Sequence, residues 1–128
     1  MAKKVNIEDL WKLIQVLRGE NGCPWDRRQT LDSFKKYVIE ETKEVIEAID
    51  AKKPEQIKEE LGDLLWDVLF LAKIAEDEGL FKLEDVVKTV YEKMVRRHPH
   101  VFGNVKVRNT EEVRELWKRI KKQERSLK

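Results

Sequence analysis

The sequence predicts an all-α protein built like a four-helix bundle with an additional C-terminal helix. The 128 residues include only five glycines and three prolines, and no alternating run of β-branched residues is long enough for a strand. Hydrophobic residues are 41% of the chain, which excludes disorder, and the long uncharged run that a membrane span needs is absent. We expect a single domain over residues 1–128.

The first two helices are predicted from caps and apolar spacing. Asn6 can cap a helix that runs to about residue 18, with apolar residues on one face. A turn-rich stretch follows over residues 19–28. Thr30 or Asp32 can then start a second helix, which we expect to run to about residue 51.

Three more helices are expected in the rest of the chain. Pro54 suits the first turn of a third helix, which should end near Gly79. A fourth helix is predicted over residues 83–97 and should stop at Pro99. Thr110 is expected to cap a basic fifth helix that carries acids in its first turn and bases later, as the helix dipole prefers.

Cysteine content and the N-terminal residues indicate a cellular compartment. Cys23 is the only cysteine, so an internal disulfide is excluded. The first ten residues lack the apolar segment of a secretion signal. A cytoplasmic location is therefore the default expectation.

The net charge of +2 conceals a strong asymmetry along the chain. Residues 37–78 carry 13 acidic and 5 basic side chains, whereas residues 91–128 carry 5 acidic and 12 basic ones. These charges either keep a helical protein soluble or take part in chemistry.

The acids of the second helix do not all lie on its polar face. On a helical wheel, Glu41 falls among the apolar residues and Glu44 falls at the margin of the same face. Glu40 falls on the outer side. Glu41 and Glu44 are therefore expected at or near the core.

The third helix carries acids in a largely apolar context. Glu60, Asp63 and Asp67 form one stripe, and most of the residues around them are apolar. A helix this apolar is expected to be largely buried, so its acids cannot all face open solvent.

Unpaired buried carboxylates cost several kcal/mol each, unless basic side chains or a cation compensate them. Glu41, Glu44, Glu60 and Asp63 offer hard oxygen ligands, which suit Mg²⁺ or Mn²⁺. Zinc would want His or Cys at a different spacing. From these residues alone, an acidic metal site and a structural set of acids both remain open.

The spaced acids resemble a known signature. Glu40-Glu41-Thr-Lys-Glu44 and Glu60-Leu-Gly-Asp63 are similar to the Glu-Glu-x-x-Glu and Glu-x-x-Asp pair of the all-α nucleoside triphosphate pyrophosphohydrolases. The stretches Cys-Pro-Trp-Asp (residues 23–26) and Arg-Arg-His-Pro-His-Val-Phe (residues 96–102) resemble the MazG family in particular. The resemblance covers about residues 7–125.

This resemblance implies Mg²⁺-dependent hydrolysis of a nucleoside triphosphate to the monophosphate and pyrophosphate, with Mn²⁺ as a possible substitute. It implies that Glu41, Glu44, Glu60 and Asp63 are the metal ligands. Glu40 is a candidate for orienting the attacking water and joins Glu41 and Glu44 in the catalytic set.

Basic and aromatic residues are candidates for binding the substrate. The resemblance points to Lys93, Arg96 and Arg97 for the phosphates, with Lys58 a weaker candidate. A cationic helix C-terminus that complements the dipole is the alternative for these residues. Trp25 could stack on a base or plug the core, and Trp117 resembles a family position near the nucleotide. Trp66 is assigned to packing or to a subunit interface.

Two other classes compete with the hydrolase interpretation. The basic C-terminal third could bind nucleic acid, although it carries no recognition-helix motif. A non-catalytic dimerisation bundle is the second alternative. In either case the apolar third helix predicts a homodimer or a higher homo-oligomer.

Overall fold

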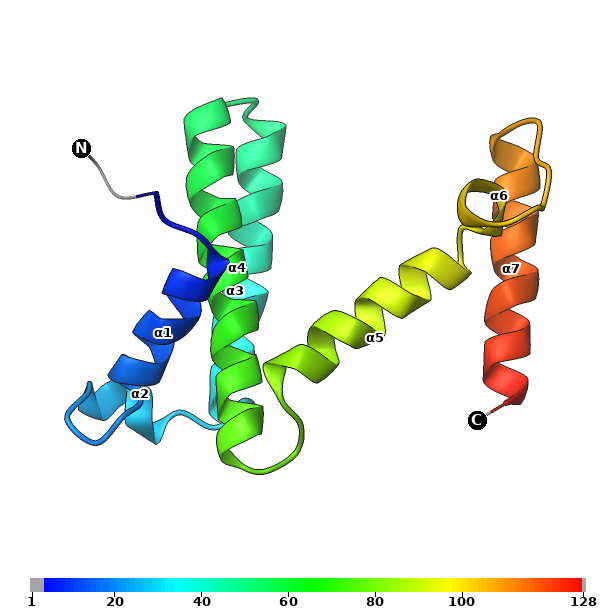
Figure 1. Cartoon of the computed structure of the whole chain (residues 1–128). Helices are drawn as coiled ribbons and strands as arrows, with labels where there is room; N and C mark the ends of the chain where they lie inside the picture. Colours follow the sequence, from blue (N-terminus) through cyan, green and yellow to red (C-terminus); the bar gives the residue numbers. More distant parts are fainter. Residues whose placement is uncertain (1–3, 128) are drawn as a thin grey trace. The chain divides into compact units, whose positions relative to one another are not determined.

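The computed structural model describes residues 4–127, which form seven helices and no strand (Figure 1). The predicted all-α fold class is confirmed. The chain divides into two compact units, one ending at Leu83 and the other beginning at Glu84. Within the part of the chain that is described, every helix is too short or too polar to cross a membrane.

The first unit begins with α1 (Ile7–Leu17), which has the predicted cap. The side chain of Asn6 accepts a 3.0 Å hydrogen bond from the Asp9 backbone N–H, and the Asp9 carboxylate accepts one from the Asn6 N–H. After α1 the chain turns so tightly that a Cβ on Gly22 would overlap the backbone oxygens of Val16 and Leu17.

A short helix, α2 (Pro24–Arg28), follows this turn. A turn-rich stretch is expected over residues 19–28, and that expectation is wrong for the five residues that form α2. Five residues are too few to show a helical period, so the proline at the first helical position is their main local signal.

A long helical hairpin forms the body of the first unit. α3 (Leu31–Asp50) is capped by Thr30, and α4 (Pro54–Asp77) has its proline in the first turn, as predicted. The two helices run antiparallel and side by side (Figure 1). The chain leaves α4 through Gly79, whose φ of +75° favours glycine.

The core of the first unit lies where α1 crosses this hairpin. Ile14 of α1, Phe34 of α3 and Phe70 of α4 are buried together, and the two phenylalanine rings stack with their centroids 4.6 Å apart. Burying these side chains stabilises the crossing by roughly 1.5–3 kcal/mol for each one.

Arg18 joins α2 and its flanking loops to α4. Its side chain is only 9% exposed, and its Nε donates a 3.0 Å hydrogen bond to Asp77 Oδ2. Its Nη1 donates to the backbone oxygens of Asp26 and Gln29, at 2.6 and 3.1 Å. The guanidinium also lies over the Phe70 ring, 5.7 Å from its centroid. One buried side chain thus holds α2 against the hairpin.

The second unit contains most of α5 (Leu83–Arg96), followed by α6 (Pro99–Phe102) and α7 (Thr110–Ser126). Pro99 begins a short helix instead of only ending α5, because a proline fits the first turn of a helix. The N-cap of α7 is Asn109 and not the predicted Thr110, since the Asn109 side chain accepts from the Glu112 N–H at 3.0 Å.

Arg18→Met keeps the apolar stem of the side chain and removes its donors. We expect the free energy of unfolding to fall by about 2 kcal/mol, because two backbone oxygens and Asp77 lose a charged partner. Urea unfolding followed by circular dichroism measures the change. The matched control is Lys35→Met, which removes an exposed ion pair with Asp32 and should leave the unfolding midpoint unchanged. Equal midpoints for the two variants would contradict this role of Arg18.

Candidate metal centre

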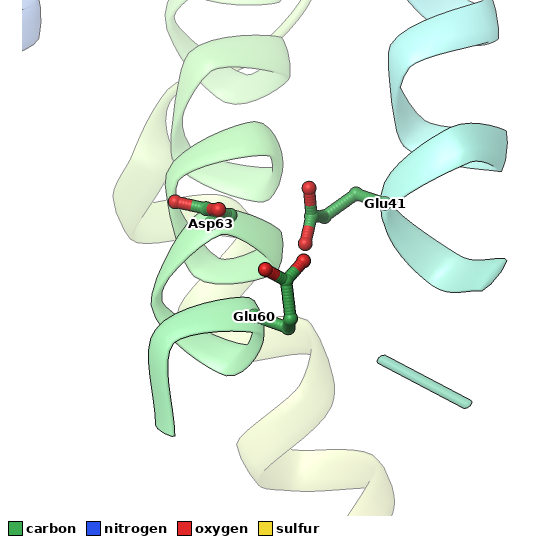
Figure 2. Close-up of side chains that lie close together, drawn as sticks. All are labelled: Glu41, Glu60 and Asp63. Carbon is green, nitrogen blue, oxygen red and sulfur yellow. The ribbon is translucent and has the colours of Figure 1, made fainter. Parts of the chain in front are cut away.

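Three carboxylates face one another across the hairpin of α3 and α4. Glu41 extends from α3 toward α4, and Glu60 and Asp63 extend from successive turns of α4 (Figure 2). Each offers an oxygen that lies within 4.8 Å of an oxygen from both other residues. Separations of this size allow a single cation to bind all three. We call these three residues the acidic triad.

The local sequence explains why these acids meet. Glu41 lies on the side of α3 that also buries Phe34, Val45 and Ala48. Glu60 and Asp63 are three residues apart, so they project from the same side of α4. Packing of the two helices therefore brings acids from separate parts of the chain together.

Burial leaves two of the triad oxygens without partners. Glu41 and Glu60 are half-buried, and Glu41 Oε1 and Glu60 Oε2 have no hydrogen-bond partner among the described residues. A buried carboxylate oxygen without a donor is costly. A divalent cation would compensate this cost.

Burial and the repulsion between neighbouring carboxylates raise the pKa values of two acids in this cluster. Burial, followed by the adjacent Glu60, Glu44 and Asp63, raises the pKa of Glu41 to about 8. The pKa of the exposed Glu44 is also raised, chiefly by its interaction with Glu60. Without a cation, Glu41 therefore retains its proton near neutral pH.

The donor set fits a hard divalent cation. All three triad residues offer carboxylate oxygens, as Mg²⁺ and Mn²⁺ prefer. The described histidines and the cysteine are not part of the cluster. Glu44 interacts with Glu60 and lies beside the triad, so it is available as a fourth acidic group.

A pocket of about 270 Å³ adjoins the triad. It has an acidic part, formed by Glu40, Glu41, Glu44 and Asp63, and an aromatic part. The aromatic side chains lie on α2, α3 and α4, and they are Trp25, Phe34, Tyr37, Trp66 and Phe70.

Several predicted site residues are therefore gathered in the first unit. Trp25 and Glu40 line the same pocket as Glu41, Glu44 and Asp63. Lys58, in contrast, lies on the exposed surface of α4 and forms an ion pair with Glu55.

The other predicted residues lie in the second unit and are described separately. Arg96 and Arg97 donate to the two carboxylate oxygens of Glu124, at 2.7 and 2.8 Å, and hold the pKa of Glu124 at about 2. Trp117 donates a 2.7 Å hydrogen bond from Nε1 to the backbone oxygen of Arg97. Lys93 is half-buried near the end of α5. Roles for these four residues in binding substrate remain predictions.

The aromatic part of the pocket was largely missed from the sequence. Tyr37 lies one helical turn before Glu41, and Phe70 lies one turn after Asp67. Helical spacing was therefore the only feature of the sequence that could have placed these two aromatic side chains beside the acids. Trp66, assigned to packing or an interface, also lines the pocket. Asp67 belongs to the predicted acidic stripe, and the structure adds that it is 92% buried and lines the pocket.

A helical hairpin with acids facing across it is an arrangement suited to divalent metal ions, and comparison with known proteins identifies the family. Residues 29–102 match the MazG nucleotide pyrophosphohydrolase domain. This match covers more than half of the chain, so the chain belongs to the MazG family. The resemblance seen in the sequence is confirmed.

Relatives and a solved structure agree with this membership. The chain is 54% identical over 97 residues to the nucleoside triphosphate pyrophosphohydrolase/pyrophosphatase MazG of Thermotoga maritima, covering 76% of this chain and 38% of that protein. It is 43% identical over 123 residues to the nucleoside triphosphate pyrophosphohydrolase of Escherichia coli K12, covering 95% and 47%. The crystal structure of a mazG-related protein from Thermotoga maritima matches with a TM-score of 0.76 and 31% identity, over 91% of this chain and 99% of that one.

The curated relatives are longer than this chain. An uncharacterized protein of Bacillus subtilis, YabN, is 54% identical over 114 residues, which are 89% of this chain and 23% of that protein. The chain thus spans between 23% and 47% of the length of these relatives.

The raised pKa of Glu41 predicts how the metal-free protein responds to pH. The folded state holds the Glu41 proton up to about pH 8, whereas the unfolded state releases it near 4.5. The folded state therefore binds more protons in this window, and stability falls as pH rises from about 4.5 to 8. We expect the Tm in EDTA to fall across this window, and Mg²⁺ to restore it at pH 8.

Glu41→Gln is the control, because it removes the titrating group. Its Tm should depend less on pH and respond less to Mg²⁺. A wild-type Tm that is insensitive to Mg²⁺ at pH 8 would count against the metal centre.

Proposed function

We propose that this chain hydrolyses nucleoside triphosphates to the monophosphate and pyrophosphate, using Mg²⁺ or, as a substitute, Mn²⁺. The observation that carries the proposal is the acidic triad in a chain of the MazG family, with two buried oxygens that have no partner in the part of the chain that the structure describes. Relatives named nucleoside triphosphate pyrophosphohydrolase support the same reaction.

The carboxylates and the triphosphate are both negatively charged, so a cation is needed between them. A triphosphate carries about four negative charges, so carboxylates alone would repel it. When bound, Mg²⁺ supplies the positive charge that joins the two sets of anions and makes water a better nucleophile. Glu41, Glu60 and Asp63, with Glu44 beside them, would hold this ion. Glu40 lines the same pocket, which supports a role in orienting water.

The reaction itself is a displacement at phosphorus. We expect water to attack the α-phosphorus, the bond from that phosphorus to the bridging oxygen to break, and pyrophosphate to leave. The carboxylates near the water accept its proton. Basic groups must bind the phosphates, and Lys93, Arg96 and Arg97 remain the candidates that the family resemblance implies.

Nucleic-acid binding by the basic C-terminal part is less well supported. Three basic side chains of α7 and of the loop before it form ion pairs with glutamates of the second unit: Arg108, Arg114 and Lys118. Paired cations contribute less to binding of phosphate backbones than free ones do.

We also propose that the chain forms a homodimer, because the surface of the hairpin exposes apolar side chains. Six large apolar side chains on α3 and α4 are about 36–58% exposed, and they recur at helical spacing: Ile39, Ile46, Ile49, Leu61, Leu65 and Val68. An apolar face of this kind on two neighbouring helices is typical of a protein interface.

Glu60→Gln should abolish most of the hydrolysis while the fold is retained. Loss of one ligand removes several kcal/mol of transition-state stabilisation, so we expect kcat to fall on the order of 100-fold. Initial rates of pyrophosphate release with a panel of triphosphates and Mg²⁺ measure this. Glu78→Gln, an exposed change at the C-terminal end of α4, is the control and should retain full activity. Orthophosphate as the only initial product would reject the proposed reaction.

Ile46→Glu places a charge in the exposed apolar face of the hairpin. If this face forms the dimer, we expect the wild type to sediment at twice the mass of one chain and the variant to shift to monomer. Sedimentation equilibrium at micromolar concentration makes the comparison. Ile7→Glu is the control, because Ile7 is equally exposed and lies at the N-terminus of α1, where an acid is tolerated. A monomeric wild type would overturn the dimer.

A further inference from the structure

The pocket beside the acidic triad joins two kinds of chemistry within one space. One part is formed by carboxylates, and the other is formed by aromatic side chains with a single buried acid, Asp67. The inference that follows rests on the proposed function, because it concerns which nucleotide the pocket accepts.

The aromatic part offers surfaces on which a nucleobase can stack. Trp25 is 48% exposed, and its ring meets that of Tyr37 edge-on, with centroids 5.5 Å apart. Beneath them, Phe34 and Phe70 are buried and stacked. Stacking of a base on an aromatic side chain contributes about 1–3 kcal/mol and is tolerant of base identity. Stacking alone would therefore not select one base over another.

Trp25 is held in this position by the buried Arg18. The bonds from Arg18 Nη1 reach the backbone oxygens of Asp26, next to Trp25 in α2, and of Gln29, just after the helix. Gln29 in turn donates from Nε2 to the Trp25 backbone oxygen at 3.1 Å. The helix that carries Trp25 is thus preorganised by these hydrogen bonds, which reduces the entropic cost of binding a ligand.

Asp67 is the polar group that could read the edge of a stacked base. It is only 8% exposed and lies between Trp66 and Phe70 on α4, one turn beyond Asp63. No ion pair or hydrogen bond from the described residues reaches its carboxylate. Burial, with a smaller effect from Asp63, raises the pKa of Asp67 to about 6. An acid that lines a ligand pocket and has no partner among the described residues is available to accept a hydrogen bond from the ligand.

We propose that the base of the substrate stacks on Trp25, with Tyr37 edge-on beside it, and that Asp67 accepts a hydrogen bond from the exocyclic amino group of the base. An ionised carboxylate only accepts hydrogen bonds. Cytosine and adenine carry amino donors where uracil, thymine and hypoxanthine carry carbonyl oxygens. With this exocyclic position directed at Asp67, an amino group donates to the carboxylate, whereas a carbonyl oxygen sets two acceptors against each other. The pocket therefore favours cytosine over uracil and adenine over hypoxanthine.

Two pairs of substrates of matched size test this preference. CTP with UTP, and ATP with ITP, differ at the exocyclic group that Asp67 is proposed to read. At pH 8 with Mg²⁺, the wild type should show a kcat/KM at least about tenfold higher for the amino member of each pair, as expected for one hydrogen bond to a charged group. Equal values within both pairs would overturn the inference.

Variants separate edge reading from stacking. Asp67→Asn offers both a donor and an acceptor, so both ratios should fall to within about twofold of unity while hydrolysis continues. Asp50→Asn, an exposed change at the end of α3, should keep the wild-type ratios. Trp25→Leu should raise KM for all four substrates alike and leave the ratios unchanged. Unchanged ratios in Asp67→Asn would overturn the role of Asp67.

Equilibrium binding provides a readout that does not depend on hydrolysis. CMP should bind to the wild type with Mg²⁺ at least about tenfold more tightly than UMP by calorimetry, and Asp67→Asn or Asp67→Ser should remove the difference. If the wild type releases no pyrophosphate from any triphosphate, the proposed function fails. If hydrolysis occurs but CMP and UMP bind equally, only the inference about Asp67 fails.

Discussion

The structure depends on the packing of α3 against α4, which forces like charges together. Glu41 sits on the buried side of one helix, and Glu60 and Asp63 project from the facing side of the other. Apolar contacts at the crossing with α1 stabilise this arrangement enough to tolerate the repulsion. Burial, followed by this repulsion, raises the pKa of Glu41 to about 8, and a divalent cation bound here would offset both effects.

The segment before the hairpin, which includes α1 and α2, contributes a side chain to the pocket beside the acidic triad. Arg18, at the end of α1, fastens α2 and pairs with Asp77 near the end of α4. The same fastening brings Trp25 to the pocket that the carboxylates line. The hairpin thus provides the acids, and the segment before it provides part of the aromatic wall. The pocket therefore combines side chains of the hairpin with Trp25 from the segment before it.

Much of the fold follows from local patterns. Long helices with clear periodicity, such as α3 and α4, were predicted close to their observed ends, because caps and prolines mark them. The short helices α2 and α6 were not predicted, since four or five residues carry no measurable period. For α7, two adjacent residues could each serve as the cap, and backbone geometry selected Asn109 over Thr110.

The sequence by itself determined the all-α class, the family resemblance and the four acids proposed to bind a metal ion, because helical period and spacing are local properties. Only the tertiary structure decided which buried oxygens of Glu41 and Glu60 find no hydrogen-bond partner within residues 4–127. It also decided that Trp25, Tyr37 and Asp67 line one pocket with the acids. These facts depend on how separate helices pack, and packing brings together residues whose distance along the chain gives no sign of their meeting.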